Sequence, residues 1–208
     1  MESLVLRTIA LSFHTDRLQP TNPATPMFRN YRVVVVASIL ATTSPLLSAN
    51  PMVGGREMYP NKNIVQNAAD SPDHTTLVAA VKAAGLVPTL ESKGPFTVFA
   101  PTNEAFDKLP PGTVNTLLKP ENKAQLTKVL TYHVVPGKIT AESLITDIRD
   151  NGGKATLKTT EGETLTARLK SGQVMIADAT GRMATVTIAD VNQSNGVIHV
   201  IDTVLLPK

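Results

Sequence analysis

The chain has 208 residues, 42% of them hydrophobic, and carries 20 Lys and Arg against 17 Asp and Glu, for a formal net charge of +3. It contains no Cys, which excludes disulfides, thiolate metal sites and cysteine nucleophiles. Four Arg but only two acidic residues lie in residues 1–49, so the remainder is nearly neutral, with sixteen basic against fifteen acidic residues. This balance, with 3 Tyr, 5 Phe and no Trp, argues against a nucleic-acid partner.

The N-terminal segments are predicted to precede the folded domain. Residues 27–49 have the pattern of a secretory signal peptide, because two Arg precede an apolar stretch and the small residues Ser48 and Ala49 suit a cleavage site. A membrane anchor is the alternative, but polar residues and a proline interrupt the apolar run, which is short for a spanning helix of about 20 residues. A signal peptide normally begins at the initiator, so residues 1–26 are interpreted as translated upstream sequence, with a long n-region or disordered leader as the alternative. Residues 50–62 are predicted to be a turn-rich, flexible lead-in.

Residues 63–90 are predicted to be helical. Ser71 is a good N-cap, the following proline suits the first helical position, and Gly85 suits the terminator. His74 stands near two aspartates, but no second ligand cluster completes a metal shell, so we interpret these residues as capping groups and a solvated histidine. The apolar face of the helix is formed by Leu77, Val78, Val81 and Ala84.

The stretch from Gly94 to Pro110 changes character within a few residues. Phe96 to Phe99 are aromatic or β-branched and predict a short buried strand, which Pro101 ends because proline cannot donate to a ladder. Thr102 or Asn103 then suits the N-cap of a new helix. The apolar side of that helix is predicted to consist of Ala105, Phe106 and Leu109.

Further helices and then hairpins follow. Spacing of apolar residues predicts a helix from Pro120 to Tyr132, with His133 on its apolar side or just past its end, followed by a strand at Val134–Val135. A short helix is expected at 113–118, and Thr140 suits the cap of another at 141–145. Beyond Asn151 the period becomes two and Gly-containing turns recur, which predicts strands and an α+β fold. The expected strands are 155–159, 164–169, 174–177, 184–189 and 197–206.

The sequence offers little for catalysis. It contains no GxSxG, HExxH, P-loop or GxGxxG motif. A pairing of His133 with Asp202 or with His199 would resemble a catalytic dyad, but no nucleophile accompanies either pair. A histidine within an apolar run is more often a hydrogen-bonded core residue, and alternation places His199 on one strand face with Val197 and Ile201. We therefore predict a protein that is not an enzyme and has no cofactor or metal site.

Three segments together resemble the fasciclin domain family: TVFAPTNEAF from Thr97, LTYHVVPG from Leu130 and NGVIHVIDTVLLP from Asn195. They stand in family order at about family spacing, and they indicate one domain at residues 63–208. The resemblance implies the fasciclin β-wedge, an α+β fold in which two small sheets meet at an angle and helices pack along one side. The motif and structural residues are Phe96, Phe99, Pro101, Thr102, Asn103, Phe106, Tyr132, His133, Gly196, His199 and Asp202.

Fasciclin domains are associated with cell-surface and matrix contact, so the resemblance implies a secreted, non-enzymatic bacterial adhesion protein of the periplasm or extracellular space. Its partner would be a surface or matrix protein or a carbohydrate, and no membrane span is expected after signal removal. In animal relatives the Tyr-His region is linked to integrin contact, which carries over onto Tyr132 and His133. The residues themselves leave His133 either as a buried neutral imidazole or as an exposed contact. The alternative function is a small-ligand carrier with an apolar groove.

Overall fold

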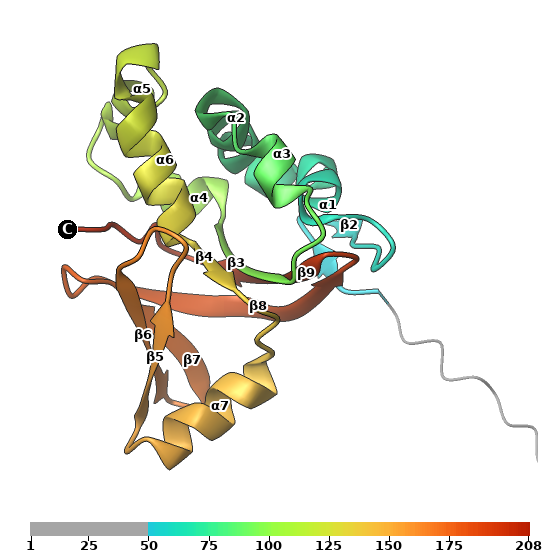
Figure 1. Cartoon of the computed structure of the whole chain (residues 1–208), viewed down its shortest axis with the longest axis vertical. Helices are drawn as coiled ribbons and strands as arrows, with labels where there is room; N and C mark the ends of the chain where they lie inside the picture. The colour runs from blue at the N-terminus through green and yellow to red at the C-terminus, as the bar shows by residue number, and fades with distance from the viewer. Residues whose placement is uncertain (1–49) are drawn as a thin grey trace, which may run out of the picture. The chain divides into compact units, whose positions relative to one another are not determined.

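The computed structural model describes residues 50–208, which form an α+β domain (Figure 1). The strands are β1 (Met52–Val53), β2 (Arg56–Glu57), β3 (Phe96–Pro101), β4 (Val134–Pro136), β5 (Lys154–Lys158), β6 (Thr164–Lys170), β7 (Gln173–Ala177), β8 (Met183–Gln193) and β9 (Gly196–Ile201). The α-helices are α1 (Ile64–Asp70), α2 (Thr75–Ala84), α3 (Val87–Leu90), α4 (Asn103–Asp107), α5 (Thr113–Leu117), α6 (Lys123–Tyr132) and α7 (Ala141–Asp150). Two 3₁₀ turns, η1 (Pro72–His74) and η2 (Pro120–Asn122), precede α2 and α6.

The main sheet has seven strands in the order β4-β3-β9-β8-β7-β6-β5, and β3 runs parallel to β9 while the other neighbours are antiparallel. Strand β8 divides this sheet into two halves, one formed with β9, β3 and β4 and the other with β7, β6 and β5. Its residues 183–185 pair with β7, whereas residues 186–193 pair with β9. Register shifts on either side of Ile188 interrupt the second pairing. Such bulges bend a strand, and in Figure 1 β5–β7 run across the direction of β3 and β9. The predicted α+β wedge is therefore confirmed.

Two apolar cores hold the two halves. The first lies between helices α1–α6 and the strands β3 and β9, and the second lies between α7 and the strands β5–β8 (Figure 1). Strand β9 contributes to both because its side chains alternate: Ile198 and Val200 enter the first core, whereas Ile201 enters the second. All six β9 residues are buried, so this strand is the shared wall of the domain.

Most predicted elements are present, with corrected ends. Gly85 terminates α2 in the left-handed conformation (φ 74°), as its position predicted. The helix predicted at 141–145 continues to Asp150, because Leu144 and Ile148 lie four residues apart and are both buried. The strand predicted at 197–206 ends at Ile201. The Asp202 N–H still bonds the Thr185 carbonyl of β8 at 3.2 Å. Farther on, the N–H groups of Leu205 and Leu206 bond the side chains of His133 and Asp178 instead of a neighbouring strand.

The lead-in at 50–62 is folded onto the domain, which corrects the prediction of a flexible segment. Its β1–β2 hairpin buries Val53 and, just beyond, Met58 in the first core. The backbone of Tyr59 exchanges two hydrogen bonds with the Asn67 side chain of α1, at 3.1 and 2.7 Å. Alternating polar and turn residues concealed this packing, because only two of the thirteen side chains reach the core as large apolar groups.

His74 is buried, with 3% of its surface exposed, so the predicted solvated histidine is wrong. Ser71 stands at the N-cap position of η1 but makes no cap bond, and its hydroxyl instead bonds His74 Nδ1 at 2.9 Å. Burial lowers the pKa of His74. The ring lines a small cavity together with Ala100 of β3 and Ile198 of β9.

Candidate functional site

The opening motif forms a corner between β3 and α4. Phe99 is fully buried on β3, Phe106 is buried on α4, and Phe96 at the start of the strand is partly buried. Pro101 is buried at the last position of β3, where the strand ends as predicted. The Thr102 hydroxyl accepts a hydrogen bond from the Ala105 N–H at 3.3 Å and so caps α4.

The sequence suggested Asn103 as a cap of its own helix, but its side chain bonds the start of α2 instead. Its Oδ1 accepts hydrogen bonds from the Thr76 N–H at 3.0 Å and the Thr75 hydroxyl at 3.2 Å, which satisfies the start of α2. Its Nδ2 donates to the Pro72 carbonyl at 2.9 Å. A residue of the opening motif therefore caps a helix that lies earlier in the chain.

Tyr132, at the end of α6, joins this helix to the β5–β8 half of the main sheet. The residue is fully buried, its hydroxyl donates to the Thr164 carbonyl at 3.1 Å and accepts from the Ala179 N–H at 3.0 Å. Burial raises the pKa of Tyr132, so the phenol is neutral in the folded protein at physiological pH.

His133 follows on the same helix end and is 3% exposed. Its Nε2 accepts a hydrogen bond from the Leu205 N–H at 3.0 Å, so Nδ1 carries the proton and donates to the Val129 carbonyl at 2.8 Å. Burial lowers the pKa of His133 to about 4. The ring thus ties α6 to the C-terminal segment, whereas the bond to the opening motif is made by the backbone, from the Phe99 N–H to the His133 carbonyl at 2.9 Å.

His199 occupies the corresponding place in the closing motif. It is fully buried and stacks on its β3 neighbour Phe99, with ring centroids 5.6 Å apart. Its Nε2 bonds the Ile139 carbonyl at 2.9 Å, which makes Nε2 the donor, and Nδ1 accepts from the Asp190 N–H at 3.3 Å. Burial lowers the pKa of His199. Both ring nitrogens are therefore used within the fold.

The remaining motif residues, Asp202 and Gly196, also make close contacts within the domain. Asp202 Oδ1 accepts from the Thr185 N–H at 2.7 Å, and Lys108 donates to the Asp202 carbonyl at 2.6 Å. Gly196 pairs with Phe96 across the parallel strands so closely that a Cβ atom would meet the Phe96 carbonyl. Only glycine fits this register, which explains its place in the motif.

These contacts exclude the catalytic dyads considered from the sequence, His133 with Asp202 and His133 with His199. His133 bonds the Val129 carbonyl and the Leu205 N–H, while His199 bonds the Ile139 carbonyl and the Asp190 N–H, so neither ring bonds the other or Asp202. Within residues 50–208 no group of three or more His, Cys, Asp or Glu is placed to hold a metal ion. The three motifs meet in a junction, which we call the motif junction, where the side chains of Tyr132, His133 and His199 are hydrogen-bonded within the domain.

The resemblance implies that Tyr132 and His133 are partner contacts, but their side chains are not presented at the surface of this structure. Tyr132 is 0% exposed and His133 is 3% exposed, and the polar atoms of both rings are bonded inside the domain. The other interpretation of His133, a buried and neutral imidazole, describes its position.

Sequence reasoning missed two polar clusters that join distant segments. Asn195 donates to the Leu90 and Ser92 carbonyls at 2.7 and 3.0 Å, and accepts from the Ile64 N–H at 3.1 Å. Asp178 accepts from Thr180 and Arg182 in its own turn and from the Leu206 N–H at 2.9 Å. In the sequence these residues stand in turn patterns, Asn-Gly for Asn195 and Asp-x-x-Gly for Asp178. Such patterns predict a loop, but they do not indicate which distant residue the side chain bonds.

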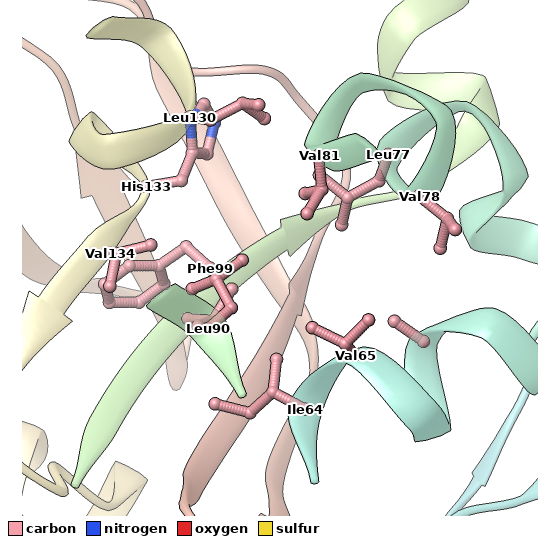
Figure 2. Close-up of a pocket in the computed structure, with 12 residues that line it drawn as sticks. Ile64, Val65, Leu77, Val78, Val81, Leu90, Phe99, Leu130, His133 and Val134 are labelled. Atoms are coloured by element: carbon pink, nitrogen blue, oxygen red, sulfur yellow. The ribbon is translucent and has the colours of Figure 1, made fainter. Parts of the chain in front are cut away.

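An apolar pocket lies between α1, α2, β3 and α6 (Figure 2). Ile64, Val65 and Val78 point toward it from one side, and Leu130 and His133 from the other. The cavity measures about 30 Å³, room for only about one or two water-sized groups. A ligand pocket is usually about 300–1,000 Å³, so this space is far smaller than a preformed ligand site.

The chain matches the model of the Fasciclin domain over residues 72–207. It is 56% identical over 144 residues to protein sll1483 of Synechocystis, covering 69% of this chain and 73% of that protein. It is 30% identical to the cell surface glycolipoprotein MPB83 of Mycobacterium bovis, covering 96% and 86% of the two chains. The solved FAS1 domain pair of the insect cell adhesion molecule Fasciclin I shares the fold, with a TM-score of 0.64 at 22% identity, over 71% of this chain and 51% of that one. The chain belongs to the fasciclin domain family.

Proposed function

We propose that this protein is a secreted, non-enzymatic adhesion module that contacts a protein or a carbohydrate at a cell surface or in a matrix. The observation that carries the proposal is that the motif side chains are bonded to groups of the same domain, Tyr132, His133 and His199 above all. We therefore infer that the protein binds its partner through exposed side chains outside these motif residues. The family and the names of its relatives, which include a cell adhesion molecule and a cell surface glycolipoprotein, support the same function.

Secretion is part of the proposal and rests on the predicted signal peptide at 27–49, which lies outside the described residues, as does the predicted upstream segment 1–26. No helix among residues 50–208 has the length and apolar character needed to cross a bilayer. We predict a mature chain that begins near Asn50. The intact mass of the protein recovered outside the cytoplasm measures this directly, and a product that retains residues 1–26 would contradict both the start site and the signal peptide.

Adhesion is tested with beads that carry the mature domain. We expect such beads to bind native cell envelopes, and a pull-down followed by arrays of surface glycans and proteins to identify the class of partner. Beads that carry the same domain after heat denaturation are the control. Equal retention of native and denatured domain, or no retention of either, would reject the adhesion function.

A small-ligand carrier is the second candidate, favoured by the apolar pocket beneath α1 and α2. Its volume of about 30 Å³ is the argument against a preformed site. Native mass spectrometry of protein purified from its source separates the two functions. A stoichiometric bound molecule would favour the carrier, and the mass of the chain alone would favour adhesion.

A further inference from the structure

The outer face of the β5–β8 half of the main sheet concentrates positive charge. Along β5, β6, β7 and the first residues of β8, buried side chains alternate with outward ones, and α7 packs on the buried side. The outward positions of residues 154–158, 164–170, 173–177 and 183–187 include no carboxylate. They carry four exposed cations, Lys154, Lys158, Arg168 and Lys170, which we call the cationic sheet face.

The register places two of these cations directly opposite each other. Lys154 pairs with Arg168 across β5 and β6, and such partners have Cβ atoms about 4.5–5.5 Å apart. Lys170 stands two residues beyond Arg168 on the same face, about 7 Å along the strand. Like charges in these positions repel each other and lower the stability of the sheet. The arrangement therefore costs free energy unless an anion compensates it.

No carboxylate in the described part of the chain supplies that compensation. The ion pairs of residues 50–208 use Lys62, Lys108, Lys119 and Lys128, and none involves the cationic sheet face. Residues 50–208 carry sixteen basic and fifteen acidic residues, so the surface outside this face has twelve against fifteen. The domain is nearly neutral as a whole, but its positive charge is concentrated on this face and the rest carries a net negative charge. Such an uneven distribution attracts a polyanion to this face.

We propose that the cationic sheet face binds an anionic polysaccharide, one whose sugars carry carboxylate or sulfate groups. This inference rests on the proposed adhesion function and specifies its partner and surface. Between the cations lie Thr156 and Thr166, which face each other across the strands and offer hydroxyls for hydrogen bonds with sugars. Partly exposed Met175 and exposed Met183 offer apolar contact for the C–H faces of sugar rings.

Other polyanions fit this face less well. Its outward positions hold no aromatic side chain on which the bases of a single strand could stack. A broad sheet face presents neither a helix for the major groove of a duplex nor an amphipathic helix for a bilayer surface. A flexible chain with repeated charges instead meets several cations at once, and linked weak contacts reinforce one another.

The test measures binding of the mature chain to sodium alginate, a polyuronate, and to dextran sulfate, with neutral dextran as the ligand control. The face variant carries K154Q, K158Q, R168Q and K170Q. The matched control carries K82Q, K93Q, K123Q and K138Q, which remove the same charge from exposed positions outside the ion pairs. We expect the face variant to lose affinity by about tenfold or more and the control by about twofold at most, with wild-type binding weakened by salt. The two polyanions distinguish a carboxylate from a sulfate preference.

Equal losses in the two variants would overturn the proposal, because they would report net charge alone. Tighter binding to duplex DNA or to anionic phospholipid vesicles than to either polysaccharide would also overturn it. If the face variant fails to fold, amide chemical shifts of the wild-type domain with alginate oligosaccharides give the answer: changes on β5–β8 support the face, and changes confined to α1–α6 reject it. Envelope binding that the face variant retains would reject this face while the adhesion function stands, whereas a wild-type domain that binds no envelope would reject both.

Discussion

The motif junction and the cationic sheet face are both rich in polar groups, but they use them in opposite ways. At the junction, Tyr132, His133 and His199 are buried, and each polar atom of their rings has a partner at 2.8–3.3 Å. On the sheet face, Lys154 and Arg168 stand opposite each other without an ion pair among residues 50–208. The polar groups of the first region are paired within the fold, whereas the cations of the second form no ion pair in the described residues, which is why we propose the second as the binding surface.

This difference separates two questions: which residues the family motifs consist of, and which surface is proposed to bind a partner. Buried polar groups must be paired because a stranded donor or acceptor costs about 1–3 kcal/mol, so the identity of motif residues is tightly constrained by stability. Exposed cations are solvated, so even two that face each other cost only about 0.2–1 kcal/mol, and the sheet still folds with them in place. We therefore expect mutations at the junction to unfold the domain and mutations on the face to change binding.

The largest expected effect is that of Phe99→Ala. Phe99 is fully buried, belongs to the second core and stacks on His199, so its removal should lower the free energy of unfolding by about 3–5 kcal/mol through lost burial and a cavity. Denaturant melts measure the change, and Met183→Ala on the exposed face is the control, expected within about 0.5 kcal/mol of wild type. A small loss for Phe99→Ala would mean that the junction is not the stable region we describe.

The pH dependence of stability should follow His133. Its pKa falls from an ordinary 6.5 to about 4 on folding, so the unfolded state binds more protons between these values. The stabilisation is complete above pH 6.5 and is lost as the pH falls toward about 4, by up to about 3 kcal/mol. Burial lowers the pKa of His74 and His199 in the same direction. Melts from pH 7.5 to about 4 should show a shallower fall in His133→Ala, and parallel curves for the two proteins would refute the assignment to this ring.

At neutral pH, His133→Ala should lower stability by about 1–3 kcal/mol, because it strands the Leu205 N–H and the Val129 carbonyl. Loss of envelope binding in this variant should then track the unfolded fraction, which circular dichroism at the assay temperature gives. A variant that melts like wild type yet no longer binds would instead make His133 a contact residue, and the contrast between the two regions would fail.

The smallest expected effect is an increase in stability. Lys154→Glu converts the repulsive pair with Arg168 into an attractive one and should raise the free energy of unfolding by about 0.2–1 kcal/mol while polyanion binding weakens. Lys158→Glu is the control, because Lys158 stands opposite Thr164 and gains no such partner. If both substitutions change stability equally, the two cations do not face each other as the register indicates.

The order of elements and the placement of apolar residues were determined by the sequence alone. The alternation in 197–201, the prolines around the opening motif and the glycine after α2 predicted a strand, a corner and a helix end that the structure contains. These signals are local, because backbone conformation at proline and glycine and the period of apolar residues depend on neighbours in the chain.

The tertiary structure decided which polar residues meet. Asn103 caps α2 instead of its own helix, Asn195 binds α1 and the α3 end, and the His133 ring finds Leu205, 72 positions away. Two side chains of the lead-in, Val53 and Met58, likewise pack in the first core. A hydrogen-bond partner far along the chain leaves no periodic trace, since any nearby donor or acceptor satisfies a buried group equally well. The cationic sheet face needed the same information: its four cations are scattered along the sequence, and only the register of β5 with β6 brings them onto one surface.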